Sequence, residues 1–150
     1  MDKPLIVQTI QLALTPVFML VAIGNIMNIL STRLARIVDR SRVLQQLHAD
    51  TDGPEHDAAV REIRLVARRI HLIGRAILLL VSAGLCVGVT VVLLFIEDMA
   101  GVDLKPLVSI IFVASLALLI GALLLFLRET REATAALRIP ETYLELERRL

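Results

Sequence analysis

The chain has 150 residues, of which 57% are hydrophobic and 21% are charged, and its formal net charge is +1. Soluble domains contain about 45–50% apolar residues, so this composition and a mean hydropathy of +0.77 exclude an ordinary soluble domain. The length is that of one domain. We therefore expect a single all-α integral membrane domain.

Three stretches without a charged residue follow one another, at residues 4–30, 76–96 and 107–127. The second and third have 21 residues each. As helices they would be about 30 Å long, the thickness of the hydrocarbon core of a bilayer. The first is too long for a secretory signal, and no Ala-x-Ala site follows it. We predict transmembrane helices at about residues 6–30, 76–96 and 107–127.

The first span also carries polar residues, which fall within one broad side of a helix. They are Gln8, Gln11, Thr15, Asn25, Asn28 and, just beyond the span, Thr32. A polar stripe of this kind is unfavourable against lipid. Two interpretations are open. In one, Asn25 and Asn28 bond to the other two spans of the same chain; in the other, the stripe forms a homo-oligomer interface or lines a pore.

The segment between the first two spans, residues 31–75, has the pattern of an antiparallel helical hairpin. In residues 31–48 and 58–75, apolar residues recur at steps of mostly three and four. Between them, residues 49–57 read ADTDGPEHD, and Gly53–Pro54 is a strong turn signal. The spacing of the histidines and acids near this turn fits neither an EF-hand nor a zinc motif. A solvated turn is favoured over a metal site, and no cofactor is predicted.

Charge sets the expected orientation. Nine arginines lie between residues 31 and 75, whereas the loop at residues 97–106 is mainly acidic. Since basic segments stay in the cytoplasm, the N-terminus is predicted to be periplasmic, and the hairpin and the tail at residues 128–150 cytoplasmic. In that tail, residues 128–138 should extend the third helix, and residues 141–150 have the pattern of a short amphipathic helix.

The hairpin also holds the candidate charged site. Its members are Arg33, Arg36, Asp39, Arg40, Arg42, Arg68, Arg69 and Arg75. They could fix the orientation and contact anionic lipid headgroups. Alternatively, Asp39 and Glu62 could make partly desolvated bonds with arginines that lock the hairpin or join subunits. Nucleic acid is not an expected partner, because the patch adjoins the membrane and only 3% of the residues are aromatic.

Small residues indicate where helices approach closely. Gly84 and Gly88 form a GxxxG pattern in the second span, and Ala117 and Gly121 have the same spacing in the third. Facing patterns of this type allow close backbone contact between membrane helices. They predict the contact of spans two and three within one chain.

Several segments resemble a known family. They are TPVF at residues 15–18, RLARIVDRSR at 33–42, REIRLVARR at 61–69 and LIGRAIL at 72–78. With them, residues 5–138 are similar to bacterial membrane proteins of the domain of unknown function 2721 family. The resemblance implies three spans and a place in the bacterial inner membrane. It implies no established activity and no catalytic residues.

No enzyme signature is present: the sequence has no phosphate-binding glycine loop, no HExxH and no GxSxG. A non-enzymatic protein is therefore expected, and two functional classes fit. The first is a homo-oligomer that forms a pore lined by the first span. The second is a membrane scaffold or regulatory subunit that binds a partner through its basic hairpin and C-terminal tail.

Overall fold

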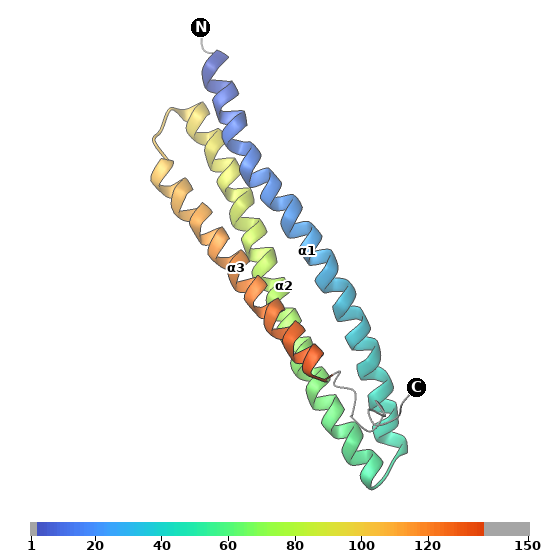
Figure 1. The fold of residues 1–150 in the computed structure, drawn as a ribbon. Helices are drawn as coiled ribbons and strands as arrows, with labels where there is room; N and C mark the ends of the chain where they lie inside the picture. Colours follow the sequence, from blue (N-terminus) through green and yellow to red (C-terminus); the bar gives the residue numbers. More distant parts are fainter. Residues whose placement is uncertain (1–2, 137–150) are drawn as a thin grey trace, which may run out of the picture.

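The computed structural model contains three long helices in an antiparallel arrangement (Figure 1). They are α1 (Lys3–Asp50), α2 (Pro54–Ala100) and α3 (Lys105–Ala136). The structure describes residues 3–136, with the side chains of residue 11 and of residues 13–134. The predicted all-α fold is confirmed. All three helices are long and apolar enough to cross a membrane, which supports a multi-pass membrane protein. The amphipathic pattern at residues 141–150 lies outside the described residues.

The turn between α1 and α2 is shorter than predicted. Only residues 51–53 connect the two helices, instead of the nine residues 49–57. Gly53 has a φ of 70°, which a residue without Cβ adopts readily. Pro54 follows in the first turn of α2, where a missing N–H has no cost, and the Asp57 N–H donates to the Gly53 carbonyl at 3.2 Å. The flanking polar residues therefore continue the helices.

A seven-residue repeat joins α1 to α2. The buried residues of α1 include Ile23, Leu30, Ile37 and Leu44, and those of α2 include Ala59, Val66, Ile73, Leu80 and Val87. Spacing of this kind is typical of a left-handed coiled coil, in which side chains of one helix fit between those of the other. The repeat passes from the apolar segments into the charged ones without interruption. α1 and α2 are thus paired through both parts of the molecule.

α2 lies between α1 and α3 and contacts both (Figure 1). At residues 101–104 the chain turns into α3; Gly101 has a φ of 65°, and its N–H donates to the Glu97 carbonyl at 3.0 Å. At the other end, α1 and α2 continue past the end of the described part of α3. We call residues 31–50 and 54–75 the arms, and the arms together with residues 128–136 the charged end. Each arm of some 20 residues is about 30 Å long.

Candidate functional site

The charged end contains a buried carboxylate that belongs to α3. The side chain of Glu129 is 0% exposed. Arg69 of α2 donates from Nε and Nη2 to its Oε1, at 3.0 and 2.9 Å. Arg33 of α1 places Nη2 3.2 Å from its Oε2. This second contact is an ion pair without hydrogen-bond alignment, since Oε2 has no hydrogen-bond partner among the described residues. We call Arg33, Arg69, Glu129 and Thr130 the Glu129 cluster.

These side chains meet because each lies just outside the apolar segment of its own helix. Arg33 follows the buried Leu30 by one turn, Arg69 precedes the buried Ile73 by one turn, and Glu129 comes two residues after the third apolar stretch. All three groups therefore leave the apolar layer at the same level. Arg33 also donates from Nη1 to the Thr130 hydroxyl at 3.4 Å, so it holds two neighbouring residues of α3.

The cluster is only partly desolvated. Arg33 and Arg69 are 32% and 26% exposed, so both side chains are mostly covered but still reach water. The guanidinium of Arg33 lies 5.2 Å from the centroid of the Phe126 ring, which favours a cation over the ring face. Two arginines on one glutamate leave a net charge of +1. The cluster therefore joins three helices and remains cationic.

A second carboxylate links α2 to α3 further from the apolar segments. Oε1 of Glu132 lies 3.0 Å from Arg68 Nη2 and 3.4 Å from Arg128 Nε. The two arms are joined separately, because Arg40 donates from Nε to Oε1 of Glu62 at 2.8 Å. Exposed pairs of this kind contribute about 0–1 kcal/mol each. The bonds at Glu132 and Glu62 therefore orient the helices more than they stabilise them.

Within one chain, Asp39 does not occupy the desolvated position that the second hypothesis gives it. Its side chain is 73% exposed and lies 3.7 Å from Arg42, which is itself 75% exposed. Asp39 points away from α2 because the core positions on either side of it, Ile37 and Leu44, turn toward α2. Among the described residues, the fully buried carboxylate is Glu129. Glu62 does face the first arm, as the hairpin hypothesis expected, although its side chain is 43% exposed.

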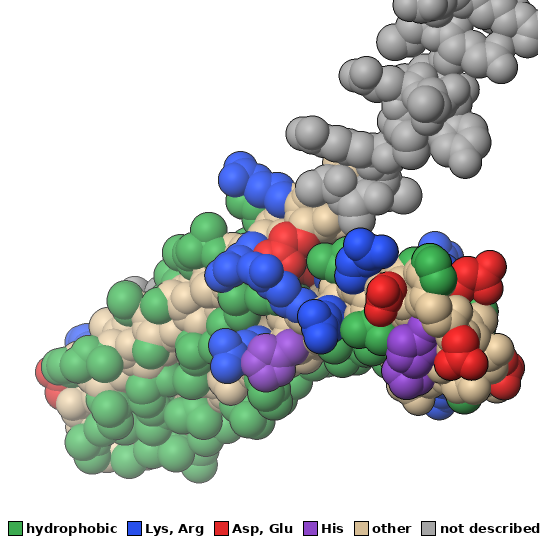
Figure 2. Space-filling view, turned by 90° about the horizontal axis from the view of Figure 1, so that it is seen from below, with side chains coloured by type: hydrophobic (Ala, Val, Ile, Leu, Met, Phe, Trp, Pro, Cys, Tyr) green, Lys and Arg blue, Asp and Glu red, His purple; other side chains and the backbone are tan. Residues whose placement is uncertain are grey.

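Two arginines of the candidate charged site, Arg36 and Arg75, take no part in these ion pairs. Arg36 and Arg75 are exposed, and neither has an acidic partner within the part of the chain that the structure describes. Figure 2 shows charged side chains gathered over the end of the bundle near the α1–α2 turn, while hydrophobic ones cover most of the other end of the visible face. The charged end is thus sharply separated from the apolar segments.

The polar stripe of α1 faces away from the other two helices. Gln11, Thr15, Asn25, Asn28 and Thr32 are all exposed, whereas Ile23 and Leu30 on the opposite side are 3% and 0% exposed. The side chain of Gln8 lies outside the described set. Thr32 donates to the Asn28 carbonyl at 3.0 Å, but neither asparagine side chain has a hydrogen-bond partner among the described side chains. Within the described part of one chain, Asn25 and Asn28 therefore make no side-chain bond to α2 or α3.

Of the four small residues predicted to form the contact between α2 and α3, only Gly121 does so. A Cβ at Gly121 would lie 3.3 Å from Leu79 Cδ1, so Gly121 does lie against α2. Gly84 instead faces α1, where Ile23 and Leu20 lie 3.9 Å from the corresponding point, and Gly88 has no such neighbour within 4 Å. Ala117 is exposed. The prediction was wrong for these three because spacing alone does not show which neighbouring helix a small residue faces.

The turn brings two histidines together without forming a metal site. The rings of His48 and His56 have centroids 4.2 Å apart, and His56 Nδ1 lies 3.1 Å from the Thr51 carbonyl. Among the described residues, no group of three or more His, Cys, Asp or Glu side chains is arranged to hold a metal ion. The two rings and their neighbours close the end of the hairpin.

Three long apolar helices with one charged end define an all-α, multi-pass membrane protein. A family model described as protein of unknown function, DUF2721, matches residues 13–139. The chain belongs to this family, which confirms the resemblance seen in its arginine-rich segments. No curated protein and no solved structure matches the chain.

Proposed function

We propose that the protein is a non-enzymatic membrane protein that assembles with copies of itself through the outer face of α1, around an axis lined by that helix. The observation that carries this proposal is the position of Asn25 and Asn28. Both lie within the apolar part of α1, both are exposed on the single chain, and neither side chain is hydrogen-bonded within the described residues. A polar side chain at this depth is unfavourable against lipid and is satisfied by another helix or by water.

The outer face of α1 has its own seven-residue repeat. Its members are Gln11, Phe18, Asn25, Thr32 and Asp39, and all of them are exposed. Side chains seven residues apart lie on one side of a helix, so these residues form a continuous strip that a second helix can follow. Phe18 is 70% exposed and supplies an apolar contact between the polar positions. The same helix would then pair with α2 on one side and with a second copy on the other.

Hydrogen bonds between helices would favour this assembly. In membranes a polar side chain that bonds across a helix interface contributes about 0.6–2 kcal/mol. Each contact would occur again in every copy of a closed, symmetric oligomer, which is the common form of self-association. The repeat of the outer face would also fix the register of the copies, as a polar residue does in a soluble coiled coil.

Single cysteines test the interface. In a Cys86→Ala background, Asn25→Cys and Asn28→Cys are expected to crosslink between chains in native-like lipid. Leu85→Cys and Ile110→Cys are the matched controls, because these side chains are 68% and 67% exposed on α2 and α3. They are expected to remain monomeric on a denaturing gel, since their exposure is to lipid.

Reaction with a small, charged thiol reagent distinguishes two forms of the assembly. Modification of Asn25→Cys and Asn28→Cys without the same reaction at the controls would indicate a water-filled axis, and hence a pore. Crosslinking without modification would indicate a dry interface. A monomer by mass measurement in lipid, with both positions inert, would contradict the proposal.

The orientation forms part of the same proposal, in a bacterial inner membrane. The arms carry the arginines and the loop at residues 97–106 the acids, which supports a periplasmic N-terminus and a cytoplasmic charged end. A reporter inserted at Gly53 and one fused after Leu150 are expected to signal cytoplasm, and one at Ala100 the periplasm. An external signal at Gly53 would reverse the orientation.

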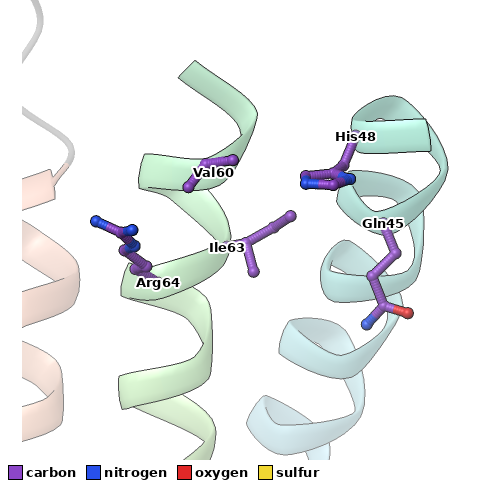
Figure 3. Close-up of a pocket in the computed structure, with 5 residues that line it drawn as sticks. All are labelled: Gln45, His48, Val60, Ile63 and Arg64. Carbon is purple, nitrogen blue, oxygen red and sulfur yellow. The ribbon is translucent and has the colours of Figure 1, made fainter. Parts of the chain in front are cut away.

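A groove at the tip of the arms favours a second candidate, a scaffold that binds a protein partner through the hairpin and the tail. It has a volume of about 400 Å³ and is lined by Gln45, His48, Val60, Ile63 and Arg64. Figure 3 shows His48 of α1 and Ile63 of α2 pointing into the space between the arms, while Arg64 extends away from α1. If the protein is a monomer in lipid, this groove becomes the leading candidate for function.

A further inference from the structure

We propose that the edge between α2 and α3, where both helices leave the apolar layer, binds the phosphate of an anionic glycerophospholipid. The proposed site consists of His71 and Arg75 on α2 and Arg128 on α3, with Arg68 at its outer limit. It uses neither the outer face of α1 nor the tip groove. It rests on the chain lying in a membrane, but not on self-association.

Cationic groups at this edge exceed the acids that face them. Arg68 and Arg128 share the single carboxylate of Glu132, so one positive charge remains uncompensated. Their side chains are 59% and 60% exposed, which leaves N–H groups free for another acceptor. His71 and Arg75 are also exposed and have no acidic partner among the described residues. The edge therefore carries a surplus of donors and positive charge.

Three contacts fix the register of the two antiparallel helices. Arg68 lies against Glu132, Arg69 against Glu129, and Leu79 against the position of Gly121. Counting from these contacts, His71 is level with Arg128, and Arg75 lies about one turn closer to the apolar segments.

The basic side chains also share one edge of the helix pair. Because Arg68 and Arg128 reach the same oxygen of Glu132, Arg128 lies on the edge of α3 that adjoins Arg68. His71 and Arg75 follow Arg68 at three and seven residues, on the same side of α2.

The apolar surface beside the cations selects a lipid over a free anion. Arg75 is the last charged residue before the apolar stretch of α2, and Arg128 is the first after that of α3. One turn into the apolar layer, Leu78 and Leu124 are 67% and 60% exposed. A ligand held here would have its phosphate among the cations and its acyl chains on these leucines. Basic pockets between membrane helices bind anionic headgroups in this way.

Lipid selectivity of the full chain tests the site. The protein is reconstituted in phosphatidylcholine vesicles with a trace of spin-labelled phosphatidylglycerol or spin-labelled phosphatidylcholine, and the motionally restricted fraction of each label is measured. We expect the wild type to restrict phosphatidylglycerol at least threefold more strongly than phosphatidylcholine. Arg75→Gln is expected to reduce this ratio by half or more, and Arg75→Gln with Arg128→Gln to bring it to about one. Arg75 has no acidic partner within the described residues, so the single variant retains the ion pairs of the fold.

Arg64→Gln is the matched control. It removes the same charge from an exposed position of the same helix, about 16 Å further from the apolar layer at 1.5 Å per residue. Its selectivity should equal that of the wild type. An equal loss in Arg64→Gln would show general attraction by the charged end and would overturn the site. A wild-type ratio of one would also overturn the site. Loss of the selectivity on addition of inorganic phosphate at constant ionic strength would overturn it too, because it would indicate a site for the free anion.

Discussion

Replacing Glu129 with glutamine is expected to lower the free energy of unfolding by about 3 kcal/mol, because two arginines then face each other without a buried counter-charge. Loss of one partner of a buried ion pair costs roughly 3–5 kcal/mol. We expect the lower end of this range, since Arg33 and Arg69 are still 32% and 26% exposed and water can partly replace the carboxylate. Equilibrium unfolding in detergent or lipid measures the change.

Two carboxylates outside the Glu129 cluster are controls for this experiment. Glu132→Gln and Glu62→Gln are each expected to change stability by less than about 1 kcal/mol, because the arginines that they contact are well exposed. Methionine at positions 33, 69 and 129 together should recover most of the loss, since an apolar replacement of a whole buried charge group is often neutral. A Glu129→Gln variant as stable as the wild type would mean that the cluster does not hold the three helices together.

Leu44→Ala is expected to open the arms while leaving the apolar segments closed. The Leu44 side chain is 0% exposed and is the last core residue of α1 before the turn. A buried Leu→Ala change costs about 2–5 kcal/mol, because the cavity is filled only in part. Around 3 kcal/mol would raise the population of the open arms roughly a hundredfold, at 1.36 kcal/mol per tenfold.

Hydrogen exchange followed by peptide mass measurement locates the opening. Amides of residues 40–66 should exchange faster in Leu44→Ala, and those of residues 76–96 at the wild-type rate. Leu47→Ala is the matched control on the same helix, because Leu47 is 43% exposed and its loss leaves no cavity. Uniform acceleration along the whole chain would show that the arms and the apolar segments unfold together.

The sequence was sufficient for the elements of the fold, because each has a strong local signal. Charge-free stretches of 21 residues predict spans without reference to the rest of the chain. The stripes of the arms and the Gly53–Pro54 signal likewise predict a hairpin. The exact length of the turn did not follow, since Pro54 is equally compatible with a loop and with the first turn of a helix.

Arg33 and Arg69 of the Glu129 cluster were among the candidate residues, but Glu129 and Thr130 were not predicted, because the contacts of the cluster lie far apart in the sequence. Glu129 pairs with Arg69 at a separation of 60 residues, and Arg33 reaches Thr130 at 97. Asp39 was the acidic candidate of the first arm because it stands among arginines on its own helix, where the spacing between residues gives the pairing. A usable signal did exist: Glu129 is the first acid after an apolar span, at the depth where Arg33 leaves the first one. The distance of each charged residue from the end of its apolar stretch therefore predicts that Glu129 and Arg33 lie at the same level.

The unbroken pairing of α1 and α2 has a mechanical consequence. Each is one helix of 48 or 47 residues, about 70 Å long at 1.5 Å per residue, of which about half lies within the apolar layer. No loop separates the arms from the segments inside that layer, and the same seam of side chains holds both parts. A twist or tilt applied at the tip of the arms therefore acts directly on the parts of α1 and α2 that lie in the apolar layer.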